Sequence, residues 1–281
     1  TTQIRGVTVA GVAALSADQI AALTTTTLGA FTTLQIRALS AAQLAGLTTE
    51  QIPGLTTTQV AALTATQFRS LPSTDLEALS SAQLAALGAG HIAALTWTQI
   101  QYASGTFIAR LNVFQLGALT ATAAGALSST QLRSLTAAAM SGVSATQLQA
   151  MTTTTLSALA ANQLAGLTAT AAQNISRTQL ASLSAYQLTG LNALHMAALT
   201  PDAVAGFSTA QLAALNATQL RGLTTSSLNT LSGEQLSSLT STQINGLTGA
   251  QIGGLTTTAL AALSVTQLKG LTAAQMTSLG A

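Results

Sequence analysis

Apolar residues recur along this chain with an eight-residue period, Leu-Thr-x-x-Gln-Leu-x-Ala/Gly, whose frame holds without insertion from Val7 to Leu279. One apolar slot starts at Val7, and Ala103 is its only occupant that is not bulky. A second apolar slot runs from Ile4 to Met276. An unbroken short period is typical of a solenoid, in which each unit packs only on its neighbours.

Each octad carries the signals of a helix start. The residue after each Leu is nearly always Ser, Thr or Asn, the preferred N-caps, and Gln commonly follows three positions later, as in Ser40 and Gln43. This pair predicts a capping box, and the two apolar slots that flank it predict a hydrophobic staple. The small residue before each Leu, such as Gly46, is expected to allow close approach and, where it is Gly, a positive φ.

These short helices cannot join into one long helix. Eight residues advance about 800° at 3.6 residues per turn, so an apolar stripe would drift by about 80° in every octad. Thr-rich runs such as residues 24–27 favour a β-solenoid, whereas the Ala, Gln and Leu content and the three-and-five spacing favour helices. We therefore predict an all-α solenoid of very short capped helices, one per octad, as a single continuous domain over residues 1–281; a β-solenoid is the alternative.

The rare charged residues predict how many octads form a coil. Two stretches carry charges of alternating sign in every second octad, which would place them above one another if two octads, 16 residues, close one coil. Duplication of a 32-residue block explains the same spacing. An exposed ladder of this kind contributes only a few tenths of a kcal/mol per rung. The predicted ladder consists of Arg5, Asp18, Arg37, Glu50, Arg69, Asp202, Arg221 and Glu234.

Composition argues against several classes of function. Charged residues make up 5% of the chain, aromatic residues 3%, and there is no Cys, so the side chains used in catalysis and metal binding are scarce. The net charge of +2 is too sparse for binding to nucleic acid. No stretch approaches the roughly 20 apolar residues that a membrane-spanning helix needs. We predict no enzyme activity, cofactor, metal site, small-molecule substrate, nucleic-acid partner or membrane span.

Four titratable residues stand at or near the Gln slot. His91 and His195 each occupy that slot, so each is expected to replace a capping Gln. Asp75 occupies it as well, with Glu77 two residues later. No neighbouring His or Cys completes a metal site, and a lone pair of carboxylates is a weak indication of acid–base chemistry. Capping and solvation are the expected roles of both carboxylates.

One region departs from the repeat. Four of the eight aromatic residues, Trp97, Tyr102, Phe107 and Phe114, lie close together around Ala103, and Phe107 replaces a Gln. One interpretation is local repacking, in which an aromatic ring fills the volume that Ala103 leaves. The other is an exposed patch that docks a partner or a second copy of the chain.

The octads, for example Leu39-Ser-Ala-Ala-Gln-Leu-Ala-Gly, resemble the low-complexity octad arrays of large secreted or surface proteins of bacteria, which are adhesin- or filament-like. The resemblance covers essentially the whole chain and is specific for the type of repeat. It implies an extracellular or cell-surface location, in bacteria, and it carries no catalytic motif.

We therefore expect a non-catalytic structural protein that forms an extracellular filament, sheath or adhesin stalk. Its expected partner is itself, because neither end shows a polar capping repeat and uncapped solenoids can stack end to end and contact one another laterally. One alternative is an ice-binding protein that uses Thr arrays; another is a protein-binding scaffold. The Thr runs are residues 24–26, 56–58, 152–154 and 256–258.

Overall fold

A computed structural model describes residue 4 and residues 6–279 of the chain. This part of the chain contains 33 α-helices and one 3-10 helix and no β-strand, so the prediction of an all-α solenoid of short helices is confirmed. The chain divides into two compact units, residues 1–134 and residues 135–281, and we describe each by itself. The single continuous domain over residues 1–281 stays a prediction.

The described residues of unit 1 contain fifteen α-helices and the 3-10 helix η1, which forms where Pro53 lacks the N–H that an α-helical turn would use. Its elements are α2 (Val9–Ala13), α3 (Ala17–Ala21), α4 (Thr25–Gly29), α5 (Thr33–Ala38), α6 (Ala41–Ala45), η1 (Ile52–Gly54), α7 (Thr57–Ala62), α8 (Ala65–Arg69), α9 (Ser73–Ala78), α10 (Ser81–Ala85), α11 (Ala89–Ala93), α12 (Trp97–Tyr102), α13 (Gly105–Ala109), α14 (Val113–Ala118), α15 (Ala121–Gly125) and α16 (Ser129–Arg133).

Unit 2 contains eighteen α-helices of the same kind. They are α17 (Ala137–Met140), α18 (Ala145–Ala150), α19 (Thr153–Leu156), α20 (Ala161–Ala165), α21 (Ala169–Ala172), α22 (Arg177–Ala181), α23 (Ala185–Leu188), α24 (Ala193–Ala198), α25 (Pro201–Val204), α26 (Thr209–Ala214), α27 (Ala217–Gly222), α28 (Thr225–Leu228), α29 (Gly233–Ser237), α30 (Ser241–Asn245), α31 (Gly249–Gly253), α32 (Thr257–Ala261), α33 (Val265–Lys269) and α34 (Ala273–Ser278).

The helices begin as the sequence predicts. At α6 the Ser40 hydroxyl accepts the backbone N–H of Gln43 at 3.2 Å, and the Gln43 side chain accepts the N–H of Ser40 at 2.7 Å. Each corner then consists of an extended Leu, such as Leu39, followed by an extended N-cap residue. No residue in the described part of the chain has a positive φ, so the expectation of left-handed glycines is wrong: two extended residues are sufficient to turn the chain.

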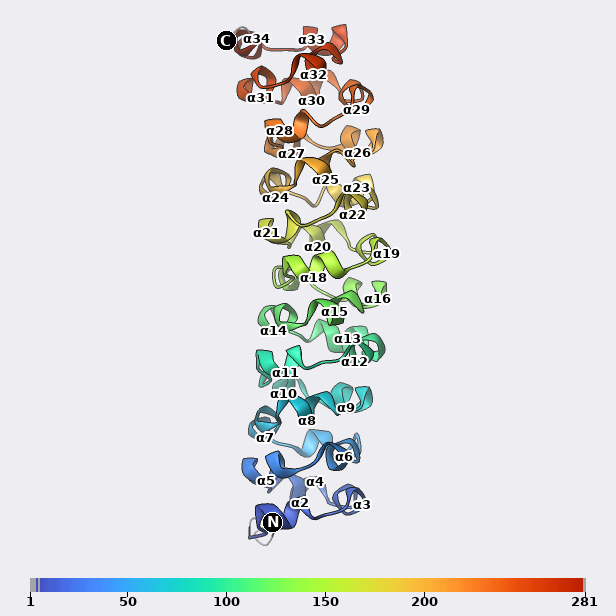
Figure 1. The fold of residues 1–281 in the computed structure, drawn as a ribbon, viewed down its shortest axis with the longest axis vertical. Helices are drawn as coiled ribbons and strands as arrows, with labels where there is room; N and C mark the ends of the chain where they lie inside the picture. Colours follow the sequence, from blue (N-terminus) through green and yellow to red (C-terminus); the bar gives the residue numbers. More distant parts are fainter. Residues whose placement is uncertain (1–3, 5, 280–281) are drawn as a thin grey trace. The chain divides into compact units, whose positions relative to one another are not determined.

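Each coil contains three octads, not two. In unit 1, α5 packs on α2 and α6 on α3, and their N-caps Thr8 and Thr32 are 24 residues apart; in unit 2, α20 packs on α17 and α21 on α18 (Figure 1). The 16-residue coil predicted from the charges is therefore wrong. The physical reason is the corner, which turns the chain through one third of a circle, so that three helices are needed to return to the starting side.

The two apolar slots of the internal octads point into the coil. Ile36 and Leu39 show the arrangement, since both are buried while the neighbouring Leu34 and Arg37 face outward. The small residue before each Leu lies against the coil below: an ideal Cβ on Gly166 would lie 1.8 Å from the carbonyl oxygen of Ala137. Close approach between coils, rather than backbone conformation, therefore requires glycine at this position.

Candidate functional site

The residue in the Gln slot fastens each coil to the one below. The Gln59 Oε1 accepts the N–H of Thr56 at 2.7 Å, while its Nε2 donates to the carbonyl oxygens of Leu28 at 2.9 Å and Phe31 at 2.7 Å. Leu28 lies in the last turn of the helix below, where its carbonyl also accepts the N–H of Phe31, and Phe31 follows the end of that helix, where backbone acceptors lack partners within the helix. We call this set of hydrogen bonds a joint. It explains why so polar a side chain is buried at almost every coil.

Unit 2 repeats the joint with the same geometry. The Gln219 side chain accepts the N–H of Asn216 at 3.0 Å and donates to the carbonyls of Leu188 and Leu191 at 2.7 and 2.8 Å. Both N–H groups of the amide donate in this way, and its oxygen accepts. The joint therefore satisfies one backbone donor and two backbone acceptors with a single neutral side chain.

The two histidines form joints as well, which confirms that each replaces a capping Gln. The Nδ1 of His91 accepts the N–H of Gly88 at 3.2 Å, and its Nε2 donates to the carbonyl of Leu63 at 2.7 Å. His195 accepts from Asn192 at 3.2 Å and donates to the carbonyl of Leu167 at 2.8 Å. Both imidazoles are assigned the neutral tautomer that carries its proton on Nε2, because Nδ1 faces an N–H donor.

At Phe107 the joint is divided among three residues. Phe107 fills the Gln slot and is only 1% exposed, but its ring makes no hydrogen bond. Instead the carboxylate of Glu77 accepts the N–H of Ser104 at 2.5 Å and its hydroxyl at 2.8 Å. Arg110, 5.7 Å from the Phe107 ring centre, donates from Nη1 to the carbonyl of Leu79 at 2.8 Å. Glu77 and Arg110 thus supply the acceptor and the donor that Gln supplies elsewhere.

Arg110 is the residue in this arrangement that the sequence analysis missed. Its Nε and Nη2 are buried without a hydrogen-bond partner. The available signal was positional: the slot before each Leu otherwise holds mostly Ala, Gly or Ser, yet Tyr102 and Arg110 occupy it in successive octads. A large cation in a slot reserved for small residues indicates a local change in packing.

Asp75 contradicts the expectation that it caps a helix and is solvated. It is 2% exposed, and its Oδ2 is buried without a partner. The N-cap of its helix is Pro72, which has no N–H for the carboxylate to accept, and α9 has no side-chain cap. Burial raises the pKa of the Asp75 carboxyl to about 6, against a hydrogen bond from Thr74 that lowers it.

The structure separates the four aromatic residues of the predicted patch. Phe107 is buried, as the repacking interpretation expects, beside the half-buried Ala103. Trp97 and Tyr102 are 50% and 70% exposed on α12, and Phe114 is 88% exposed on α14. Because α12, α13 and α14 occupy three successive sides of a coil, the four residues do not form one surface.

The predicted ionic ladder does not form among its described members. With three octads per coil, charges in every second octad move around the three sides instead of lying above one another. Asp202 pairs with Arg177, which is not a ladder residue, at 3.7 Å, and Arg221 donates to the carbonyl of Gly246 at 3.2 Å. Arg5 lies outside the described residues.

The remaining ladder residues, Asp18, Arg37, Glu50, Arg69 and Glu234, are exposed on the walls. Hydrogen bonds from the backbone N–H of Glu50 and from the Thr48 side chain hold the pKa of the Glu50 carboxyl below its usual range.

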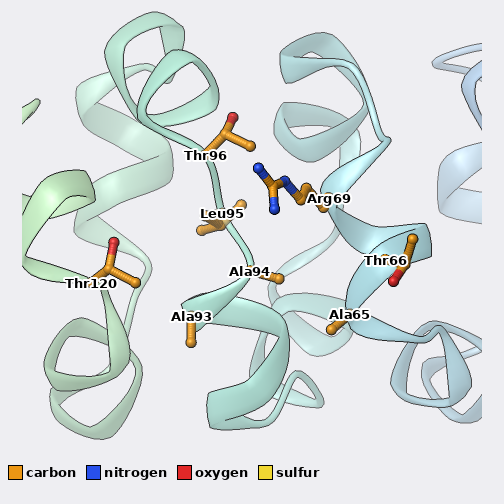
Figure 2. A pocket seen from close by; sticks show the side chains of 8 residues that line it. All are labelled: Ala65, Thr66, Arg69, Ala93, Ala94, Leu95, Thr96 and Thr120. Atoms are coloured by element: carbon orange, nitrogen blue, oxygen red, sulfur yellow. The ribbon is translucent and has the colours of Figure 1, made fainter.

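Arg69 lines a shallow groove of about 300 Å³ between successive coils of unit 1. Figure 2 shows its guanidinium directed toward the corner formed by Leu95 and Thr96. The groove combines one cation with hydroxyl and methyl groups. Its lining residues are Ala65, Thr66, Arg69, Ala93, Ala94, Leu95, Thr96 and Thr120.

The described residues contain no group of three or more His, Asp or Glu side chains placed to hold a metal ion. None of their helices is both long and apolar enough to cross a bilayer. The four Thr runs do not build one array, because in unit 1 those of α4 and α7, and in unit 2 those of α19 and α32, lie on different sides of the coil.

Comparison with known protein families identifies the repeat. Residues 25–57 and 69–102, about a quarter of the chain, match the ALTTAQ repeat. The letters ALTTAQ describe a small residue, Leu, an N-cap residue, two variable residues and Gln. Residues 62–67 of this chain follow the same order. These segments are therefore similar to a known repeat family. No curated protein matches the chain significantly.

Proposed function

We propose that this chain is a non-catalytic structural repeat protein that serves as the solenoid segment of an extracellular filament, sheath or adhesin stalk, in bacteria. The observation that supports it is the joint, which fastens successive coils with the same three hydrogen bonds in both units. A solenoid built in this way gains length by adding identical coils, each stabilised by its neighbours. Such an architecture suits a spacer, since its stability does not depend on a special site.

Self-assembly is the finer part of the proposal, and the apolar slots of α33 and α34 show the kind of contact that it would use. Leu268 and Met276 occupy the inner apolar slot, which is fully buried in internal coils, yet they are 39% and 54% exposed. At internal coils the group that covers this slot is another coil of the same repeat. In an assembly of several chains, we propose that this covering coil belongs to a second copy, whose repeats carry the same apolar and Gln slots.

Electron microscopy and light scattering over a concentration series test this proposal. The wild-type chain is expected to form species that lengthen as concentration rises. Leu268→Lys and Met276→Lys are expected to stop this growth, because each would bury a charge at the contact. Val265→Lys, on the outer wall of α33, is the matched control and should assemble normally. A wild-type chain that stays monomeric at every concentration would refute end-to-end stacking.

The location is tested on the producing cells. Antibodies against the folded chain are expected to label intact cells or their surrounding material. Labelling that requires permeabilised cells would contradict an extracellular role.

A protein-binding scaffold is the second candidate, favoured by the exposed side chains of Trp97 and Tyr102 on α12. Substitution of Trp97 by Ala distinguishes the two functions. A structural segment should assemble unchanged, whereas a scaffold that uses α12 should lose binding to its partner.

A further inference from the structure

The joint at Asp75 differs chemically from every joint that contains Gln or His. By its register the slot faces the carbonyl of Leu47, as Gln43 faces Leu15 at 2.6 Å and Gln83 faces Leu55 at 2.7 Å. The Leu47 carbonyl oxygen receives no hydrogen bond from the described residues. An ionised carboxylate has no proton to donate, so two buried acceptors are placed in the same joint.

The slots that contain Ala show why Asp75 is distinct. Ala123, Ala171 and Ala203 occupy the same position and likewise donate nothing to the coil below. A methyl group, however, brings no second acceptor and no charge into the joint. At Asp75 the carboxylate oxygen itself is buried, and the neighbouring Pro72 removes the N–H that an acceptor in this slot normally receives.

No cation offsets the Asp75 carboxylate. Below α9, the 3-10 helix η1 is preceded by Glu50, which is exposed and of the same charge. Above α9, helix α12 carries Tyr102 and no charged residue. On α9 itself Glu77 bonds to Ser104, and the exposed Arg69 of the preceding helix makes no ion pair with Asp75.

We propose that Asp75 makes this joint of unit 1 a proton-dependent contact between two coils. When the carboxyl is protonated, its O–H donates to the Leu47 carbonyl and the joint closes as a Gln joint does. When the proton is lost to water, two acceptors and a buried negative charge remain, and the contact between residues 48–55 and 72–79 loosens.

The direction of the pH effect follows from linkage. The pKa of Asp75, raised to about 6 by burial, exceeds the ordinary value of an exposed Asp, near 3.9. The folded joint therefore binds the proton more tightly than the opened one, so its stability is complete below about pH 4 and is lost as pH rises through 6. The contact is tighter in mild acid than at neutral pH.

Hydrogen exchange of the backbone amides tests the proposal, after correction for intrinsic rates at each pH. In the wild-type chain the opening constant of residues 48–55 and 72–79 is expected to rise about 10-fold between pH 5 and pH 8. Asp75→Asn, which donates an N–H at every pH, should reduce this change to less than about twofold. Asp18→Asn removes an exposed carboxylate from the same unit and should leave the wild-type response intact.

A carbon-13 titration of the Asp75 carboxyl provides a second measurement on the unmodified chain. A midpoint near 6 is expected. A midpoint near 4, or an equal pH response in the wild-type chain and Asp75→Asn, would overturn the proposal.

Discussion

Two regions of the molecule pair the backbone N–H and carbonyl groups between coils in different ways. They are the joints at Gln211 and Gln219 in unit 2 and the stretch from Pro72 to Arg110 in unit 1. In unit 2 a single amide accepts one backbone N–H and donates to the coil below. In unit 1 Glu77 accepts, Arg110 donates, and Phe107 fills the space. The difference shows that the functions of the joint glutamine are separable and need not come from one residue.

The separated joint has a physical disadvantage. Gln219 is neutral and both of its N–H donors have acceptors, whereas Arg110 leaves Nε and Nη2 buried without partners. Buried donors that lack acceptors reduce stability. We therefore expect the regular joints to contribute more to the free energy of unfolding than the joint at Phe107.

The largest effect is expected from the loss of a regular joint. Gln219→Leu keeps the volume of the side chain but leaves the N–H of Asn216 and the carbonyl of Leu191 without partners, while the Leu188 carbonyl keeps only the N–H of Leu191. The free energy of unfolding should fall by about 3 kcal/mol in urea denaturation. The same substitution at the exposed Gln19 is the control and should change it by less than ~1 kcal/mol. Equal losses at the two sites would refute the role given to the joint.

A smaller effect is expected when the separated joint is disturbed. Arg110→Ala should cost about 2 kcal/mol, because the Leu79 carbonyl loses its donor and Phe107 loses its cationic neighbour. In a chain that carries Phe107→Gln, the restored amide takes over the Leu79 carbonyl. There Arg110→Ala should cost less than ~0.5 kcal/mol, which is a coupling of roughly 1.5 kcal/mol between the two sites. Additive costs in this double-mutant cycle would show that the residues act separately.

The smallest effect is expected at the ion pair of unit 2. Arg177 and Asp202 lie 3.7 Å apart with both side chains largely exposed. Asp202→Asn should lower the free energy of unfolding by at most ~0.5 kcal/mol, and 1 M salt should remove the difference. A loss that persists in high salt would indicate a role beyond charge.

Much of the local structure follows from the sequence, because helix starts depend on neighbouring residues. Ser40 and Gln43 identify their capping box without any knowledge of the fold. The number of octads per coil does not follow in the same way, because the corner angle depends on two extended residues whose conformation the repeat leaves open. The spacing of Arg37 and Glu50 therefore predicts a coil of two octads, whereas the helices pack with three octads per coil.

The candidate site is predictable only in part for a related reason. The deviation of Phe107 from Gln is visible in the sequence, and so is the replacement of Gln by Asp75. The hydrogen bonds that result from these two substitutions depend on which residues lie one coil away. Those residues can be named only when the number of residues per coil is known. Glu77 and Ser104 are 27 residues apart, so their contact is intelligible only with a 24-residue coil.

The joint also gives the solenoid a chemical polarity. Every amide of the Gln59 type accepts within its own coil and donates toward the coil that precedes it in the chain. One face of a coil therefore presents N–H donors and the opposite face presents carbonyl acceptors. Two such stacks can continue one another only in the same direction, because contact between like faces would oppose donors to donors. An assembly that grows through this contact would be polar: all its copies would point in the same direction, and its two ends would differ chemically.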